Sequence, residues 1–182
     1  ACATGSVDLD ATVTGSFSGS GTNLFTEADS EGANYGNDET ALNDPNWSSS
    51  EWKGESDGTY SSSTGPSGPQ AGDDYIYFEA TSSSSGNLTS SVFNKSGISI
   101  SFYYHMYGNG ITSLKLQSRA TGTNTWTDRW SKTGQQHNSS STLNWTSATV
   151  DLAIYDIDQL RFQATRSNLR GDIALDNINV TY

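Results

Sequence analysis

From residue 74 to the C-terminus, the chain is a series of short segments in which apolar and polar residues alternate. In DYIYFEA, Ile76 and Phe78 fall on one side of an extended chain, and Tyr75 and Tyr77 fall on the other. Turn residues separate most segments at about the 8–12-residue spacing that is typical of β-sandwiches and barrels. No segment has a sustained helical period. We therefore predict an all-β fold, a two-sheet antiparallel jelly-roll β-sandwich. The predicted strands are DYIYFEA (74–80), NLTSSVF (87–93), ISISFYYHMYG (98–108), TSLKLQSRA (112–120), TWTDRWSKTG (125–134), LNWTSATVDL (143–152), QLRFQAT (159–165) and DIALDNINV (172–180).

The N-terminal part of the chain has a different character. Residues 1–22 are small and polar, like an interdomain linker, and allow one short strand near residues 9–13. Residues 28–72 are rich in Gly, Ser, Asn and Asp, but they also carry Trp47, Trp52 and Tyr60. A disordered linker has no need of these aromatic side chains, so we expect an ordered loop. We divide the chain into a linker with a first strand, 1–22, and one sandwich domain, 23–182.

The composition of the chain limits the classes of partner and the cellular location that we expect for it. Aromatic residues make up 11% of the chain and hydrophobic residues 32%, a balance that suits many short strands and argues against disorder. The formal net charge of -11 argues against nucleic acid as a partner. Cys2 is the only cysteine, so an intrachain disulfide is excluded. No apolar run approaches the roughly 20 residues of a membrane span. We expect a secreted, extracellular domain that is monomeric in isolation.

Several of these segments together resemble the MAM domain, a family named from meprin and receptor tyrosine phosphatase mu. The similarity runs in order from about Phe25 to Tyr182, and the blocks YHMYG and DIALDNI carry it most specifically. The chain lacks the disulfide cysteines of the animal members, which favours a bacterial secreted type. The resemblance implies a two-sheet jelly roll with a non-catalytic role in adhesion or ligand binding.

Catalytic motifs are absent. There is no GxSxG, HExxH or phosphate-cradling sequence, and nothing selects two of the twenty carboxylates as a glycosidase pair. Of the two histidines, His105 lies in an aromatic strand and is expected to pack there. His137, in the loop GQQHNSS, is the freer candidate for contacting a ligand. We therefore expect a module without a catalytic residue of its own.

A structural Ca²⁺ ion is expected, because carboxylate oxygens suit Ca²⁺ better than zinc. The resemblance implies an ion that ties the first strand to the last. On that pattern the ligands are Glu27, Asp44 and Asp176, with Asp29 and Asp74 as additions. The alternative is that these are solvated loop acids.

A sugar site needs exposed aromatic rings flanked by polar side chains. Trp126 and Trp130 stand four apart in TNTWTDRWSKTGQQHN, so a regular strand places both rings on one face. The alternatives are that one or both rings are buried, or that Trp47, Trp52 and Tyr60 form the platform.

Basic residues are concentrated in the second half of the chain, where eight bases face six acids; residues 1–94 hold one base and fourteen acids. If Arg side chains converge there, their planar forks fit sulfate or carboxylate groups. The predicted ligand-binding residues are Trp126, Arg129, Trp130, Lys132, His137, Arg119, Arg161, Arg166 and Arg170.

We accordingly interpret the chain as a carbohydrate-binding module of a secreted polysaccharide-degrading enzyme. Its expected partner is an anionic, sulfated algal polysaccharide such as fucan, porphyran or carrageenan. The alternatives are a cell-surface adhesion or protein–protein interaction module, and a spacer without a ligand.

The stretch RGDIALDNINV contains the adhesion-like tripeptide Arg170-Gly171-Asp172, but we read it as a turn that enters the last strand. In that strand Ile173, Leu175, Ile178 and Val180 are expected to face the core, with the register broken near Asn177.

Overall fold

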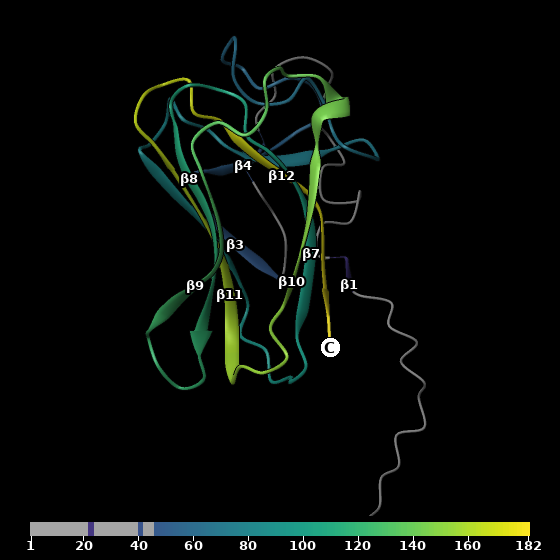
Figure 1. Cartoon of the computed structure of the whole chain (residues 1–182), viewed down its shortest axis with the longest axis vertical. Coiled ribbons are helices and arrows are strands. Elements are labelled where there is room, and N and C mark those ends of the chain that lie inside the picture. The colour runs from purple at the N-terminus through teal and green to yellow at the C-terminus, as the bar shows by residue number, and fades with distance from the viewer. Residues whose placement is uncertain (1–21, 24–39, 42–45) are drawn as a thin grey trace, which may run out of the picture.

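The protein is an antiparallel β-sandwich of two sheets (Figure 1). The structure is a computed structural model, and it describes residues 22–23, 40–41 and 46–182. The expected strand near residues 9–13 lies outside the described residues. In the described part, the one helical element is a short 3-10 helix, η2 (Thr142–Asn144).

The first sheet has seven strands in the order β10-β7-β12-β5-β4-β2, with β1 also paired to β12. These strands are β1 (Thr22–Asn23), β2 (Thr40–Ala41), β4 (Trp52–Glu55), β5 (Tyr75–Phe78), β7 (Ser99–His105), β10 (Thr146–Asp151) and β12 (Ile173–Thr181).

The second sheet has five strands in the order β3-β6-β11-β8-β9. They are β3 (Trp47–Ser50), β6 (Ser85–Ser90), β8 (Ile111–Ala120), β9 (Trp126–Thr133) and β11 (Ile157–Arg166). The predicted two-sheet sandwich is confirmed, and each of the eight predicted segments overlaps one strand of the two sheets.

The main core lies between the sheets and is built from alternate residues of the strands. Phe102 of β7 and Phe162 of β11 are fully buried, with their ring centroids 4.8 Å apart. Trp47 stacks on Phe162 at 6.1 Å, and Trp52 lies 6.3 Å from Phe78. Both Trp47 and Trp52 are therefore core residues, so the alternative sugar platform loses both of its indoles. Tyr60, its third member, is 71% exposed.

The sequence predicts a loop where the structure has the strands β3 and β4. The sequence of β3 is WSSS, with a single apolar residue, so it gives no alternation that would indicate a strand. It forms because β6 offers a full antiparallel partner, with Trp47 opposite Ser90 and Ser50 opposite Asn87. Tertiary pairing thus decides the conformation at this position.

The outward side of the seven-stranded sheet is covered. Tyr75, Tyr77, Trp145 and Ala174 form a second buried cluster there. The loop 56–73 closes over it, and the indole N–H of Trp145 donates to the carbonyl of Gly68 at 3.2 Å. The expectation of an ordered loop is met over these residues. Because this side is covered, the other sheet supplies the open strand surface of the described domain.

The last strand is irregular where the sequence predicted it. The register of β12 against β7 shifts between Asp176 and Asn179, and Asn177 has a φ of 49°. An Asn tolerates this left-handed conformation better than most residues do. The shift lets Ile173, Leu175, Ile178 and Val180 all be buried.

Candidate glycan-binding face

The solvent-facing side of the five-stranded sheet, called the outer face below, is polar. Its position follows from alternation: Leu114 and Leu116 of β8 and Leu160 and Phe162 of β11 are fully buried, so the residues between them point outward. The outer-face side chains that matter here are Asn87, Lys115, Gln117, Arg119, Trp126, Asp128, Arg161 and Gln163.

A chain of hydrogen bonds crosses three strands of the outer face. Arg161 of β11 donates from Nε to Oε1 of Gln117 on β8 at 2.8 Å. Gln117 donates in turn from Nε2 to Oδ1 of Asp128 on β9 at 2.6 Å. The other oxygen of Asp128 accepts from Nζ of Lys115 at 2.8 Å. These side chains hold one another in place, which lowers the entropy that a ligand would have to remove.

Trp126 lies at one end of this chain, with its ring on the outer face. It is opposite Arg119 in the pairing of β8 with β9, and the guanidinium carbon of Arg161 lies 4.2 Å from the ring centroid. The ring is half-buried. Trp126 and Arg161, two of the predicted ligand-binding residues, are therefore brought together.

Trp130 has the opposite orientation. Its ring packs edge-on against Phe102 at 5.1 Å and Tyr104 at 5.2 Å, at the margin of the core. The prediction that both indoles share one face is wrong, because a register shift between Leu116 and Gln117 adds an extra residue to β9. Such a bulge reverses the side of every residue beyond it.

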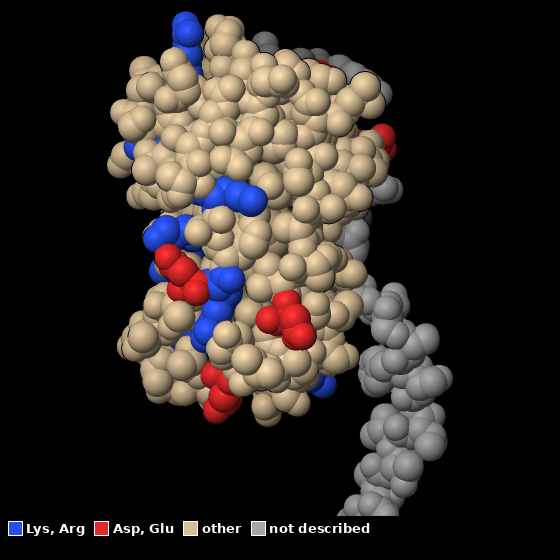
Figure 2. Space-filling model, viewed as in Figure 1, with Lys and Arg blue, Asp and Glu red and all other residues tan. Residues whose placement is uncertain are grey.

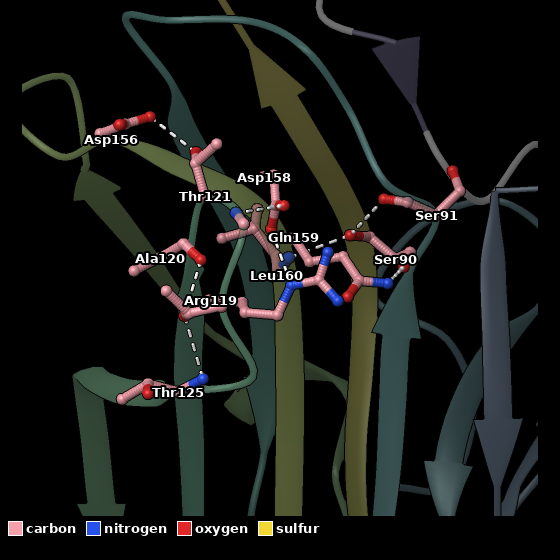
Figure 3. Close-up of polar contacts among 12 residues, drawn as sticks. Ser90, Ser91, Arg119, Ala120, Thr121, Thr125, Asp156, Asp158, Gln159 and Leu160 are labelled. Atoms are coloured by element: carbon pink, nitrogen blue, oxygen red, sulfur yellow. Dashed lines mark hydrogen bonds and ion pairs between the residues drawn. The ribbon is translucent and has the colours of Figure 1, made fainter.

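Arg119 and Asp158 form an ion pair at the lower end of the outer face (Figure 3). Nε of Arg119 on β8 lies 2.8 Å from Oδ1 of Asp158 on β11. The neighbouring Gln159 donates to the carbonyl of Ser90 at 2.8 Å, which links β11 to β6. The hydrogen bond from Arg119 holds the pKa of Asp158 below its usual value.

The remaining predicted cations lie elsewhere. Arg129 donates to the buried Ser118 and stacks over the ring of Tyr155 at 3.5 Å. Arg166, at the far end of β11 from Arg161, donates to the carbonyl of Ser83. Lys132 is opposite Leu114, which faces the core, and Arg170 is in the exposed loop before β12. Figure 2 shows blue and red side chains interleaved over the β9–β11 region. The described cations do not form one continuous patch.

The pKa values and ion pairs of the charged side chains on the outer face show which charges are compensated. A hydrogen bond from Lys115 is the main cause that holds the pKa of Asp128 below its usual value. Burial lowers the pKa of Arg161, and the charge of Asp128 partly opposes that effect. Among the described residues, Lys115 and Arg119 have carboxylate ion pairs, whereas Arg161 has none. Arg161 is thus the outer-face arginine without a carboxylate ion pair among the described residues, and Asp128 acts on it only through longer-range charge.

Both histidines are structural in their geometry. His105 is fully buried and stacks on His137, with ring centroids 4.6 Å apart. His137 is 9% exposed, and its Nδ1 accepts from the backbone N–H of Met106 at 2.8 Å. Nε2 of His137 therefore carries the proton toward the hydroxyl of Thr146, 3.0 Å away. Burial lowers the pKa of both rings, that of His105 to about 3.

Of the predicted calcium ligands, Glu27, Asp29 and Asp44 lie outside the described residues. Asp176 is buried, and its Oδ2 accepts from the backbone N–H of Gln70 at 2.7 Å while its Oδ1 accepts from that of Asn177 at 2.6 Å. Burial is the main cause that raises its pKa to about 6, and the negative charge of Asp74 adds to it. Within the described residues, no group of three or more His, Cys, Asp or Glu side chains could hold a metal ion.

The tripeptide Arg170-Gly171-Asp172 is not displayed as a loop tip. Asp172 is fully buried and accepts from the backbone N–H of Ala80 at 3.0 Å. The interpretation of this stretch as the entry to β12, rather than as an adhesion motif, agrees with that burial.

Sequence reasoning missed most of the hydrogen-bonding side chains of the outer face, among them Asn87, Lys115, Gln117, Asp128 and Gln163. The signal that identifies them is the alternation itself. Once Leu114, Leu116, Phe162 and Ala164 are assigned to the core, the polar residues between them must share the opposite face.

Known proteins resemble this chain along most of its length. The family model of the MAM domain, meprin/A5/mu, matches residues 33–182. A MAM domain-containing glycosylphosphatidylinositol anchor protein 2 from Mus musculus is 29% identical over 140 residues, which are 66% of this chain and 14% of the relative. The chain thus spans a small part of that relative's length. In the described residues, no helix is long and apolar enough to cross a membrane.

Solved structures share the sandwich fold. The K2 cleaved adhesin domain of Lys-gingipain has a TM-score of 0.54 and 16% identity, covering 75% of this chain and 90% of that one. The K1 domain of the same protein, from Porphyromonas gingivalis W83, has a TM-score of 0.51 and 15% identity, covering 74% and 89%. At these identities the likeness describes the fold alone. The family match over residues 33–182 confirms the expectation from the YHMYG and DIALDNI blocks: this chain belongs to the MAM domain family.

Proposed function

We propose that this domain is a non-catalytic carbohydrate-binding module of a secreted, polysaccharide-degrading enzyme, and that the outer face binds the glycan. The observation that carries the proposal is the outward ring of Trp126 beside the hydrogen-bonded chain of Arg161, Gln117 and Asp128. Sugar rings present an apolar C–H face and a rim of hydroxyl groups. A single aromatic ring among fixed donors and acceptors is complementary to both.

The composition of the outer face favours a glycan over a protein partner. Protein interfaces have an apolar core that excludes water. Here Trp126 is surrounded by amide, carboxylate and cationic side chains. Adjacent strands are about 4.8 Å apart and alternate residues about 6.8 Å apart, so the polar groups repeat on a scale that suits successive hydroxyl groups of an extended chain.

The charge of Arg161 supports an acidic glycan. Its Nε is held by Gln117, and its two terminal amino groups have no hydrogen-bond partner among the described residues. Two such groups in one plane fit a sulfate or carboxylate group bidentately. A sulfated algal polysaccharide such as fucan, porphyran or carrageenan has this chemistry.

A non-catalytic role is supported by the state of the titratable groups. Both histidines are buried with lowered pKa values, and the tautomer of His137 is fixed by Met106. On the outer face, Asp128 and Asp158 are each committed to a cation and have lowered pKa values, unlike the raised pKa of a general acid.

A structural Ca²⁺ ion remains part of the proposal, with Asp74 and Asp176 as the described ligands and Glu27, Asp29 and Asp44 as the others. The raised pKa of Asp176 supports it, because a buried carboxylate close to a second negative charge gains free energy from a cation. The ion would stabilise the fold and take no part in sugar binding.

Affinity electrophoresis tests the proposed function. The domain is run through gels that contain fucan, porphyran or carrageenan, and through gels that contain the chemically desulfated form of each. We expect retardation in at least one sulfated gel and less in its desulfated counterpart. No retardation in any gel, together with a homodimer in light scattering, would replace this proposal with the adhesion alternative.

A further inference from the structure

A second polar surface lies at the other end of β9, in the connection between β9 and β10. It is an open depression of about 550 Å³. The 3-10 helix η2 contributes to its lining and is the short coil near the upper end of the ribbon in Figure 1. Its lining includes Gln135, Gln136, Asn138, Leu143, Asn144 and Trp145. Among the described residues that line it, none is Lys, Arg, Asp or Glu.

Four amide side chains in this depression are each held at one end by the protein. Gln136 donates from Nε2 to the carbonyl of Thr133 at 2.9 Å. Gln135 accepts at Oε1 from the backbone N–H of Gly108 at 3.3 Å. Asn144 donates from Nδ2 to Ser139 at 2.6 Å and to Oδ1 of Asn138 at 3.4 Å.

The opposite end of each amide has no hydrogen-bond partner among the described residues. The two free acceptors are Oε1 of Gln136 and Oδ1 of Asn144, and the two free donors are Nε2 of Gln135 and Nδ2 of Asn138. A backbone N–H fixes which end of Gln135 is oxygen, and a backbone carbonyl fixes which end of Gln136 is nitrogen. In the Asn138–Asn144 pair the Ser139 hydroxyl can donate or accept, so a joint flip of both amides exchanges their free donor and free acceptor and leaves one of each. A ligand meets two donors and two acceptors that are already oriented.

The backbone that carries these amides is itself anchored. The carbonyl of Met106 accepts from the backbone N–H groups of both Gln136 and His137, at 2.9 and 3.0 Å. In turn, Nδ1 of His137 accepts a hydrogen bond from the backbone N–H of Met106. At the end of the segment, the indole N–H of Trp145 donates to the carbonyl of Gly68. The buried His137 thus acts as a support for the depression and not as a direct ligand contact. A supported site of this kind binds with a smaller entropic cost.

Leu143 supplies the apolar part of the depression. It is 92% exposed, on η2 next to Asn144, although water gives a leucine side chain no favourable partner. Paired donors and acceptors without a charge, beside one exposed aliphatic group, match a neutral sugar unit: hydroxyl groups meet the amides and a C–H face meets Leu143.

We propose that this depression is a second glycan subsite, specific for a neutral sugar unit and separate from the outer face. The inference rests on the proposed function only in the class of ligand, since the two sites share no residue. Seven residues of β9 beyond Trp126 separate it from the depression, which at about 3.3 Å per residue is roughly 23 Å. Two sites that distant allow one long glycan to bind at both, with a gain in avidity.

The test uses the whole domain, produced in a host without N-glycosylation because Asn138 and Asn144 both stand in Asn-X-Ser/Thr sequences. A panel of immobilised neutral oligosaccharides (gluco-, manno-, xylo- and galacto-series) and sulfated carrageenan oligosaccharides is probed with four proteins: wild type, Gln135→Ala/Asn144→Ala, Trp126→Ala, and Asn94→Ala as an exposed control. The double variant removes two amides without touching the core.

We expect at least one neutral series to bind wild type and the Asn94 control equally, and the double variant at least ten-fold more weakly. A titration followed by ¹⁵N NMR should shift the side-chain amide signals of Gln135 and Asn138 in wild type. If no neutral series binds, or if the double variant binds every neutral series as wild type does, the second subsite is refuted. The carrageenan arm is independent: its loss in Trp126→Ala alone supports the outer face, and its absence in wild type counts against the proposed function and not against this subsite.

Discussion

Arg161 on β11 reaches across the intervening strand β8 and places its guanidinium carbon 4.2 Å from the ring centroid of Trp126 on β9. The contact joins the one outward-facing indole of the described domain to the outer-face cation that has no carboxylate ion pair. An Arg guanidinium over an indole is a cation–π arrangement that orders both side chains. The same pair presents to solvent an apolar ring and two guanidinium amino groups that have no hydrogen-bond partner in the described part of the chain.

The two tryptophans of β9 provide a matched pair of variants. Trp126→Ala should leave the fold intact and weaken glycan binding by about 2 kcal/mol, roughly thirty-fold in Kd. Trp130→Ala should instead cost about 3 kcal/mol of unfolding free energy, because its ring packs on Phe102 and Tyr104. Thermal denaturation and affinity electrophoresis measure the two effects. Equal losses of stability in both variants would contradict the assignment of the rings to opposite faces.

Acid pH should destabilise the fold through His105. Its pKa in the folded state is lowered to about 3, below the unfolded value of 6.5. The unfolded state therefore binds a proton first as the pH falls below about 6.5, and the free energy of unfolding decreases toward pH 3. The loss attributable to this side chain is about 2 kcal/mol at pH 5.

Urea denaturation of wild type and His105→Phe at pH 7.5, 6 and 5 measures this effect. The variant should show a shallower decrease in unfolding free energy with falling pH, whatever its stability at pH 7.5. Parallel curves for the two proteins would rule out His105 as a source of the acid sensitivity.

Asp176→Asn should loosen the loop 56–73. The wild-type carboxylate accepts from the N–H groups of Gln70 and Asn177, and an amide group would turn an N–H donor toward one of them. Losing a hydrogen bond to a charged group costs about 1.5–3 kcal/mol. Asp73→Asn, an exposed residue of the same loop, serves as the control. Hydrogen exchange should rise over the loop in Asp176→Asn and stay unchanged in the control; unchanged exchange in both would count against this anchor.

Removal of Ca²⁺ with a chelator should lower the Tm of the domain, and added Ca²⁺ should restore it, since an ion that binds only the folded state stabilises it by mass action. The ratio of affinities for sulfated and desulfated glycan should not change at a temperature where the domain stays folded. A Tm that changes neither with chelator nor with added Ca²⁺ would contradict the proposed structural ion.

The parts of the fold that could be predicted from sequence are those that depend on residues close together in the chain. The strands β5 to β12 follow from apolar alternation, and the break near Asn177 follows from a polar pair inside that pattern. The short strand β3 does not, because its Ser residues become a strand only through pairing with β6. The orientation of Trp126 and Trp130 was equally hidden, since the bulge between Leu116 and Gln117 is set by the partner strand.

Part of the candidate site could be predicted from the sequence for the same reason. Trp126 and Arg161 belong to a predicted aromatic and basic set. Charge counts alone could not show that Arg119 is paired with Asp158, while Arg161 has no ion pair within the described part of the chain. His137 was expected to contact ligand from its loop position. Its burial against His105 and Met106 depends on long-range packing that no local pattern encodes.

The most direct test of the central claim is isothermal titration of wild type, Arg161→Gln and the control Arg166→Gln with sulfated and desulfated carrageenan oligosaccharides. Arg166 is on the same strand and donates to the carbonyl of Ser83 at its far end. We predict that wild type and Arg166→Gln bind the sulfated form more tightly by roughly ten-fold or more, and that Arg161→Gln loses this preference. Equal affinity of wild type for the two forms, or an unchanged preference in Arg161→Gln, would contradict the account.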